Sequence, residues 1–135
     1  MTRVLFVCVG NSGRSQMAEA FANGLGAGVL HAESAGTRPA KKLDPAVVEA
    51  MREIGYDITS RRPKALTVEM MDSADRAFTM GCGVEASCPA ALVPTEDWGL
   101  EDPKGEPMEK VREIRDEIER RVRALVAELE GETDG

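Results

Sequence analysis

Apolar positions along the chain alternate between short continuous runs and stretches with helical spacing. The run Val4–Val7 is continuous and rich in β-branched and aromatic residues, which is typical of a strand buried on both faces. From Ser15 to about Leu25, apolar residues recur every three or four positions, which predicts a helix that Gly24 and Gly26 bring to an end. Residues 29–35 have the character of a second strand.

The rest of the chain repeats this alternation. The pair Asp44-Pro45 predicts a helix start, with an N-cap followed by proline at the first helical position. A shorter helix is expected from Thr67 to about Asp72 and strands at residues 76–80 and between residues 93 and 98. Pro107 opens a long amphipathic helix.

Strands that alternate with helices indicate an open parallel α/β sheet with right-handed crossovers. With 135 residues, the chain is long enough for one core and too short for two. We therefore expect a single α/β domain over residues 1–131, built on a four-stranded parallel sheet with helices on both faces. Residues 132–135 are expected to form a frayed acidic tail.

Composition limits the binding partners and the cellular compartment that we expect for this chain. A formal net charge of −7 makes binding to nucleic acid or to an anionic membrane surface unfavourable. No stretch approaches the ~20 apolar residues of a membrane span, and the run after Arg3 is too short for a signal-peptide core. We expect a cytoplasmic monomer, in which the three cysteines stay reduced unless they take part in redox chemistry.

The stretch CVGNSGRS, residues 8–15, joins the first predicted strand to the first helix. In that position the N–H groups of a loop can converge on an anion, with the helix N-terminus completing the site. Glycines and Asn11 suit the positive φ angles of a tight loop, and Arg14 can clamp a tetrahedral oxyanion. We therefore predict an oxyanion-binding loop made of Val9, Gly10, Asn11, Ser12, Gly13, Arg14 and Ser15.

The same loop would act on Cys8. Helix N-termini and nearby cations favour the thiolate, which is the nucleophilic form of cysteine, and Ser15 can donate a further hydrogen bond to the sulfur. Taken alone, a cysteine at the end of a strand is more often a small buried hydrophobic residue. The stretch lacks the G-x-G-x-x-G of a dinucleotide site and the lysine of a nucleotide P-loop, so the loop favours Cys8 as a nucleophile.

The other two cysteines, Cys82 and Cys88, lie in MGCGVEASCPA after the third predicted strand. All three thiols thus fall at the carboxyl side of the sheet, where ligands bind in open α/β folds. In a helix, residues six apart are separated by about 9 Å of rise, whereas a disulfide needs Cα atoms within about 7 Å. A Cys82–Cys88 bond would therefore need a loop or an unwound helix, which Gly81 and Gly83 make natural; two unrelated buried cysteines remain the alternative.

Zinc binding is the main competing interpretation of the thiols. Zinc sites usually combine cysteines spaced two to four residues apart with histidine, whereas the only histidine, His31, lies inside a predicted strand. We therefore expect no metal site and a structural role for His31.

The C-x5-R-S pattern between the first strand and the first helix resembles the low-molecular-weight protein tyrosine phosphatase family. CVGNSGRSQMAEA and AESAGTRPAKKLDPAVVEAMREIGYDI are most similar to its arsenate reductase branch, and the likeness extends to the acidic tail. Many relatives carry a cysteine where this chain has Gly13, but that cysteine is not a redox member. The resemblance implies the phosphatase-like fold, arsenate as substrate, thioredoxin as reductant, and no cofactor.

For the thioredoxin-coupled reductases of this family, the resemblance implies a relay of three thiols. Cys8 would attack arsenate, and Cys82 would attack Cys8 as arsenite leaves. Cys88 would then displace Cys8, leaving a Cys82–Cys88 disulfide for thioredoxin. The sequence does not exclude another thiol system as the reductant.

The family also implies a general acid in an Asp-Pro loop, which Asp102-Pro103 matches. Such an acid protonates the departing oxygen, a role commonly worth about 10²–10⁴-fold in rate. Asp97 and Glu101 are close enough in sequence to be confused with Asp102. Phosphatases of the family usually carry an aromatic pair after Asp-Pro, whereas Lys104-Gly105 follows here, which argues against a tyrosine phosphatase.

Two alternatives stay open. A phosphatase acting on small phosphomonoesters would need Cys8, Arg14 and Asp102 but not the other cysteines. A non-catalytic thiol protein that senses arsenite or zinc would need only the cysteines.

Four other features of the sequence have structural or solvent-exposed roles as their simplest interpretation. Ser34 either supports Asn11 or caps a turn, and Glu19 is expected to be an exposed helix residue rather than a support or cation ligand. Lys41-Lys42 and Arg61-Arg62 are most simply solvated charges.

Overall fold

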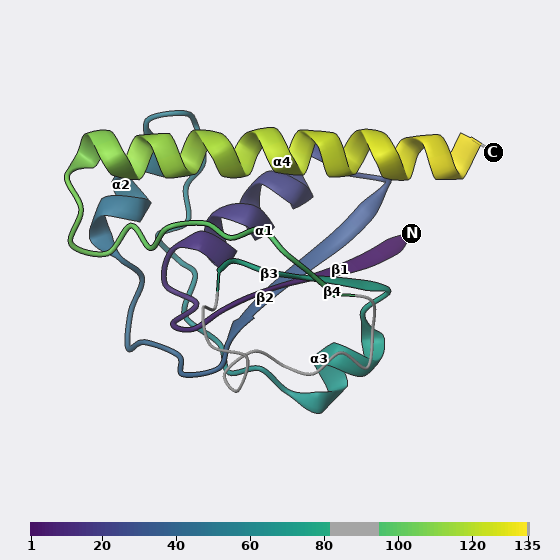
Figure 1. Ribbon diagram of the computed structural model, residues 1–135, viewed down its shortest axis with the longest axis horizontal. Helices are drawn as coiled ribbons and strands as arrows, with labels where there is room; N and C mark the ends of the chain where they lie inside the picture. Colours follow the sequence, from purple (N-terminus) through teal and green to yellow (C-terminus); the bar gives the residue numbers. More distant parts are fainter. Residues whose placement is uncertain (82–94, 135) are drawn as a thin grey trace.

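The computed structural model describes residues 1–81 and 95–134. Its four strands form one parallel sheet of order β2-β1-β3-β4 (Figure 1), which confirms the predicted fold class. The elements in chain order are β1 (Thr2–Cys8), α1 (Arg14–Leu25), β2 (Leu30–Gly36), α2 (Pro45–Arg52), α3 (Val68–Ser73), β3 (Arg76–Thr79), β4 (Thr95–Asp97) and α4 (Met108–Asp134).

Strand β1 is central and pairs with β2 on one side and β3 on the other. Its Val4–Val7 run is buried, as expected of a strand covered on both faces. The register places Cys8 opposite Gly36 of β2, and Val7 opposite Thr79 of β3. Because the strands are parallel, their carboxyl ends meet at one edge, and Cys8 lies in the middle of that edge.

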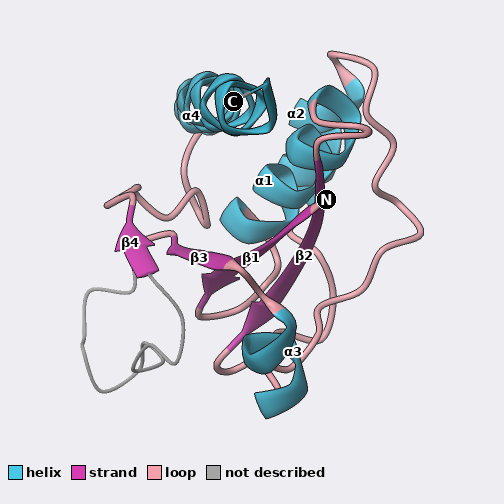
Figure 2. Ribbon diagram, turned by 90° about the vertical axis from the view of Figure 1, so that its right-hand side faces the viewer, coloured by secondary structure: helices cyan, strands magenta, loops and turns pink. Residues whose placement is uncertain are grey.

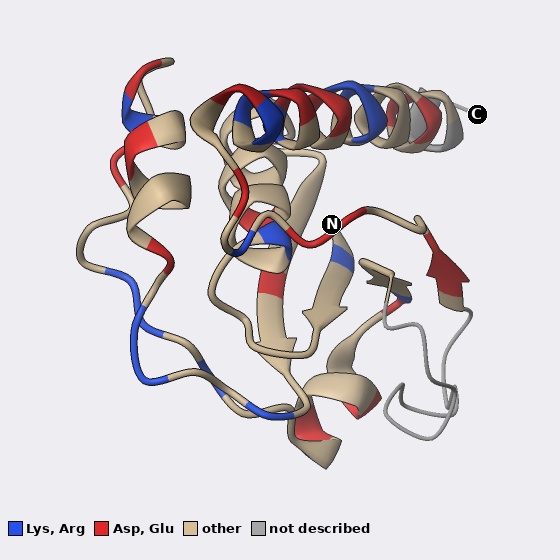
Figure 3. Ribbon diagram, turned by 60° about the vertical axis from the view of Figure 1, so that its left-hand side comes forward, with Lys and Arg blue, Asp and Glu red and all other residues tan. Residues whose placement is uncertain are grey.

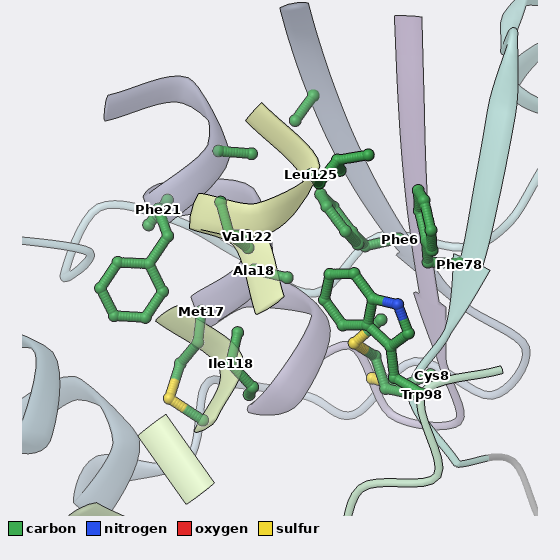
Figure 4. Close-up of a cluster of buried hydrophobic side chains, with 14 of the residues drawn as sticks. Phe6, Cys8, Met17, Ala18, Phe21, Phe78, Trp98, Ile118, Val122 and Leu125 are labelled. Carbon is green, nitrogen blue, oxygen red and sulfur yellow. The ribbon is translucent and has the colours of Figure 1, made fainter. Parts of the chain in front are cut away.

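Helices cover both faces of the sheet, as Figure 2 shows: α1, α2 and α4 lie on one side and α3 on the other. The main core is on the first side, where Phe6, Phe78 and Trp98 pack with ring centroids 4.9–5.7 Å apart beside α4 (Figure 4). On the other face, Leu5 and Val7 form a smaller cluster with side chains from α3 and its flanks. None of the helices in the described ranges is long and apolar enough to cross a membrane.

Two predicted helix starts are capped by side chains, and the cap at Asp44 was expected. The Asp44 side chain accepts a hydrogen bond from the Ala46 N–H at 3.0 Å, and the Thr67 hydroxyl accepts one from the Met70 N–H at 3.1 Å. These bonds satisfy N–H groups that the first turn of a helix leaves free.

Two expectations about helix ends differ from the structure. Helix α1 ends at Leu25 with Gly26 as its cap, but Gly24 lies inside the helix. A Cβ on Gly24 would come within 3.0 Å of the Tyr56 ring, so this glycine provides room for Tyr56 rather than a stop. Helix α4 continues to Asp134, past Gly131, where the tail was expected to begin.

Candidate active site

The loop between β1 and α1 is held by a second segment, residues 37–44. The carbonyl groups of residues 8, 9, 10 and 12 accept hydrogen bonds from the backbone N–H groups of residues 37, 38, 40 and 44, at 2.8–3.2 Å. The N–H groups of residues 9, 10, 12 and 13 donate to no acceptor within residues 1–81 and 95–134. Because its carbonyls are occupied by a neighbouring segment while these N–H groups have no acceptor there, the loop has the arrangement that an anion-binding loop requires.

Only one residue of this loop has a positive φ. Asn11 has a φ of 50°, while Gly10 and Gly13 do not have positive values, contrary to the expectation for the glycines. Gly13 is needed for space instead, since a Cβ there would lie 3.3 Å from the Pro103 ring and 3.4 Å from Val47. Glycine at this position lets the Asp-Pro loop approach the anion loop closely.

The Asn11 side chain is the centre of a buried hydrogen-bond network. Its Oδ1 accepts from the backbone N–H of Lys64 at 2.8 Å and from Gln16 Nε2 at 3.0 Å. A backbone N–H can only donate, so this contact fixes which end of the amide is the oxygen. Nδ2 therefore donates to the hydroxyl groups of Ser15 and Ser34, at 2.8 and 3.0 Å.

Cys8 lies at the end of this network, with 3% of its surface exposed. Its Sγ accepts a hydrogen bond from the Asn11 N–H at 3.1 Å and lies 2.8 Å from Ser15 Oγ. Because Ser15 Oγ already accepts from Asn11, its own proton is free to point at the sulfur. With that proton position, both contacts donate to the sulfur, and the predicted Ser15–Cys8 hydrogen bond is present.

The far end of the network is Glu19, which is buried at 6% exposure rather than solvated as expected. Its carboxylate accepts from the Ser34 hydroxyl at 2.8 Å, lies 3.3 Å from Lys64 Nζ, and pairs with Arg61. Burial, and then the nearby charge of Arg61, lower the pKa of Lys64 below its ordinary value. Two protein cations thus neutralise Glu19, and Arg61 is not the solvated charge that the sequence suggested.

Arg14 is also buried and ties the loop to the neighbouring strands. Its Nη1 donates to the carbonyl oxygens of Met80 and Leu100, at 2.6 and 2.9 Å. Its Nη2 lies 4.0 Å from Asp102 Oδ2. Anchored through Nη1, the guanidinium presents its other edge to the pocket above Cys8, as a bidentate anion clamp requires.

A pocket of about 310 Å³ opens above the sulfur. It is lined by Cys8 and most of the anion loop, by Arg38, and by residues 102–104. The three candidate acids are thereby separated: Asp102 faces the pocket, Glu101 pairs with Lys110 at 3.0 Å, and Asp97 does not line the pocket.

Asp97 has a structural role that could not be predicted from the sequence. Its Oδ1 accepts from Thr79 Oγ1 and from the Gly81 N–H, both at 2.8 Å. Burial raises the pKa of Asp97, but these hydrogen bonds and one from the Gly99 N–H outweigh it and hold the pKa below its ordinary value. Asp97 therefore fixes the chain where β3 ends.

Gly81 is the last described residue before the segment that carries Cys82 and Cys88, and both cysteines lie outside the described residues. Gly81 has a φ of 90°, and a Cβ there would lie 2.5 Å from the Leu100 carbonyl oxygen, so only glycine fits. Its carbonyl oxygen is 3.4 Å from Arg14 Nη1. The segment with Cys82 thus leaves the described structure next to the pocket's arginine.

No group of three or more histidine, cysteine, aspartate or glutamate side chains that could hold a metal ion occurs within the described ranges. His31 lies at an exposed position of β2.

Comparison with known proteins gives a consistent family. A model of the low molecular weight phosphotyrosine protein phosphatase family matches residues 3–134. The chain is 43% identical over 133 residues to a Halobacterium salinarum protein named "Putative arsenate reductase", covering 95% of this chain and 93% of that one. It is 38% identical over 133 residues to a Synechocystis protein named "Glutaredoxin arsenate reductase", covering 96% and 99%.

Solved structures similar to this chain come from the same group of proteins. An arsenate reductase in a phosphate-binding state is 37% identical, with a TM-score of 0.83 over 96% of this chain and 99% of that one. A thioredoxin-dependent arsenate reductase from Corynebacterium glutamicum is 37% identical, with a TM-score of 0.81 over 96% of this chain and 62% of that one. The YwlE arginine phosphatase from Geobacillus stearothermophilus is 28% identical, with a TM-score of 0.86 over 98% and 95%.

Proposed function

The chain belongs to the low molecular weight phosphotyrosine protein phosphatase family, and we propose that it is an arsenate reductase working through Cys8, Cys82 and Cys88, with thioredoxin as reductant. The observation that carries the proposal is the Cys8 sulfur, which accepts hydrogen bonds at the floor of a pocket that also holds Arg14 and Asp102. The names of relatives at 38–43% identity point to arsenate as the oxyanion.

In the first step, the pocket binds arsenate through the free N–H groups of the loop and the guanidinium of Arg14. The Cys8 thiolate attacks arsenic, forming an S–As bond. One As–O bond breaks, and Asp102 gives its proton to the departing oxygen, which leaves as water once fully protonated. This role for Asp102 is supported by its position in the lining of the same pocket as Cys8.

In the second step, the Cys82 thiolate attacks the Cys8 sulfur. The electron pair of the S–As bond passes to arsenic, so arsenic gains two electrons and leaves as arsenite while a Cys8–Cys82 disulfide forms. The Cys88 thiolate then attacks the Cys82 sulfur and releases Cys8 as a thiolate. The resulting Cys82–Cys88 disulfide is reduced by the thioredoxin dithiol through the same exchange chemistry.

A phosphatase is the second candidate, since the YwlE arginine phosphatase shares the fold over nearly the whole chain. Its chemistry would begin with the same attack by Cys8 but would end in hydrolysis of the thiol adduct. Cys82 and Cys88 would then have no role, which allows the two functions to be separated.

A single turnover tests the proposal. We expect fully reduced protein, mixed with arsenate and no external reductant, to lose two thiols per chain and release one arsenite, with a Cys82–Cys88 disulfide found by mass spectrometry. The Cys88→Ser variant should instead stop with a Cys8–Cys82 disulfide and fail to cycle with thioredoxin. If no thiol is lost, the reductase assignment fails and hydrolysis of phosphate esters becomes the assay of choice. Recycling by glutaredoxin but not thioredoxin would refute only the choice of reductant.

We expect Asp102→Asn to lower the rate of arsenite formation about 10²-fold in single turnovers, because asparagine cannot supply the proton to the departing oxygen. Glu101→Gln is the matched control: it removes a neighbouring carboxylate that pairs with Lys110 outside the pocket, and it should leave the rate nearly unchanged. Equal losses in the two variants would remove Asp102 from the mechanism.

A further inference from the structure

The positive charges of this acidic chain are unevenly placed. Segments 37–44 and 59–66 together contain six Lys and Arg and a single acidic residue, whereas the whole chain has a net charge of −7. Segment 59–66 pairs with the last residue of β2, which directly precedes segment 37–44: the Gly36 N–H donates to the Lys64 carbonyl at 2.8 Å and the Leu66 N–H donates to the Gly36 carbonyl at 3.0 Å. Their cations, which we call the basic face, are Arg38, Lys41, Lys42, Arg61, Arg62 and Lys64.

Figure 3 shows the same asymmetry: Lys and Arg gather along the loops at the lower left, whereas both signs of charge alternate along α4. On the basic face, Arg61 and Lys64 are paired with buried Glu19. The other four cations take part in no salt bridge within the described part of the chain. Most of the charge of the face is therefore available to act on a solute.

The basic face is concave. Lys41, Lys42, Arg61 and Arg62 surround a cavity of about 420 Å³, whose walls include the apolar side chains of Leu43, Pro45 and Val48. Its single acidic lining residue, Glu49, is paired with Arg52. A hollow in which one sign of charge predominates, with walls of low dielectric constant, focuses the electric field and raises the local concentration of counter-ions.

The face is also continuous with the pocket above Cys8. Arg38 and Ala40 line that pocket, and Lys41, which follows directly in the chain, lines the basic cavity. Adjacent Cα atoms are about 3.8 Å apart, which is well within the screening length of about 8–10 Å at physiological ionic strength. The potential of the face therefore extends to the pocket mouth.

We propose that the basic face concentrates dianionic oxyanions at the mouth of the Cys8 pocket and so offsets the repulsion from the chain's net negative charge. This inference rests on the proposed function in that it takes arsenate as the substrate. The local concentration of an ion varies exponentially with its charge times the potential, so a dianion responds as the square of the response of a monoanion.

The test neutralises two cations that touch neither substrate nor the Cys8 loop. We expect Lys41→Gln/Lys42→Gln to lower kcat/KM for arsenate about 3–10-fold at low ionic strength, through KM, with kcat unchanged. The loss should disappear near 1 M salt, where the screening length is about 3 Å. The matched control, Arg120→Gln/Arg123→Gln, removes the same charge from exposed positions of α4 and should have no such effect.

A second measurement does not depend on arsenate chemistry. The rates at which iodoacetate, an anion, and iodoacetamide, a neutral reagent, alkylate Cys8 are followed on the Cys8 peptide by mass spectrometry. In Lys41→Gln/Lys42→Gln, the iodoacetate-to-iodoacetamide ratio should fall by about the square root of the loss seen with arsenate, while iodoacetamide alone reacts as in the wild type.

These two measurements distinguish a failure of the proposed reductase function from a failure of the proposed role of the basic face. If wild-type protein forms no arsenite but the alkylation ratio falls as expected, the proposed function is wrong and the electrostatic role of the face stands. An unchanged ratio and an unchanged KM for arsenate would overturn the inference. The same holds if the variant raises only the KM for thioredoxin, because the face would then serve an acidic protein partner.

Discussion

Replacing Cys8 with serine is expected to abolish arsenate reduction, with no arsenite and no thiol lost in a single turnover. A serine hydroxyl is not ionised near neutral pH, and its oxygen cannot enter a disulfide. In the proposed mechanism, the variant therefore lacks both the nucleophile and the first electron donor of the relay. The loss is measured by arsenite release and by titration of the remaining thiols after mixing with arsenate.

The fold and the anion loop should survive this change. Serine can accept the same hydrogen bonds that the sulfur accepts from the Asn11 N–H and the Ser15 hydroxyl, so the melting temperature should stay close to that of the wild type. Arsenate should still raise that temperature, because the loop N–H groups and Arg14 remain. Arsenite formation by Cys8→Ser would show that Cys82 and Cys88 reduce arsenate unaided, which contradicts the mechanism.

Most of the fold could be predicted because its signals are local. The apolar run Val4–Val7 and the Asp44-Pro45 helix start each lie within a few residues, and both elements form where expected. Strand β4 could be placed only within residues 93–98, since its three residues, Thr95–Asp97, are all exposed and leave no apolar pattern. The role of Gly24 could not be predicted, because Tyr56, the side chain it makes room for, is remote in sequence.

The candidate active site was predictable in its centre and only partly in its supports: the contacts of Ser15 and Ser34 were among the interpretations, whereas that of Lys64 was not. The spacing of Cys8 and Arg14 is local, and the structure places both in one pocket. The contacts that orient Asn11 come from Ser34 and from Lys64, which are 23 and 53 residues away. No pattern within a helix or strand encodes such contacts, which is why Glu19 looked like an ordinary helix residue.

The roles of Cys82 and Cys88 stay predictions, since both lie outside the described residues. What the structure adds is the setting of Gly81, which precedes them. The Asp97 carboxylate and the Arg14 guanidinium both contact the Gly81 backbone. The Gly81 backbone and the Arg14 guanidinium therefore depend on each other for their positions, so a change in Arg14 is expected to disturb Gly81 as well.

Replacing Arg14 with lysine is accordingly expected to lower kcat/KM for arsenate about 10³-fold, the upper end of what loss of one oxyanion donor costs. A planar guanidinium donates to Met80 and Leu100 through one nitrogen while facing the pocket with the other. A lysine ammonium is a single point and cannot span both positions. Steady-state kinetics with arsenate, and protection of Cys8 from alkylation by bound arsenate, measure the loss.

Arg115→Lys is the control that separates chemistry from stability. Arg115 is equally buried at 7% exposure, and its Nη1 donates to the Ala50 carbonyl at 2.8 Å and to Glu53 at 2.9 Å. None of these three residues lines the Cys8 pocket. Each variant leaves buried carbonyl groups short of a donor, which costs about 1–3 kcal/mol of stability, so their melting temperatures should fall by similar amounts. Only Arg14→Lys should lose activity. If both variants lose activity in proportion to stability, Arg14 supports the fold and the oxyanion must be held by the loop N–H groups alone.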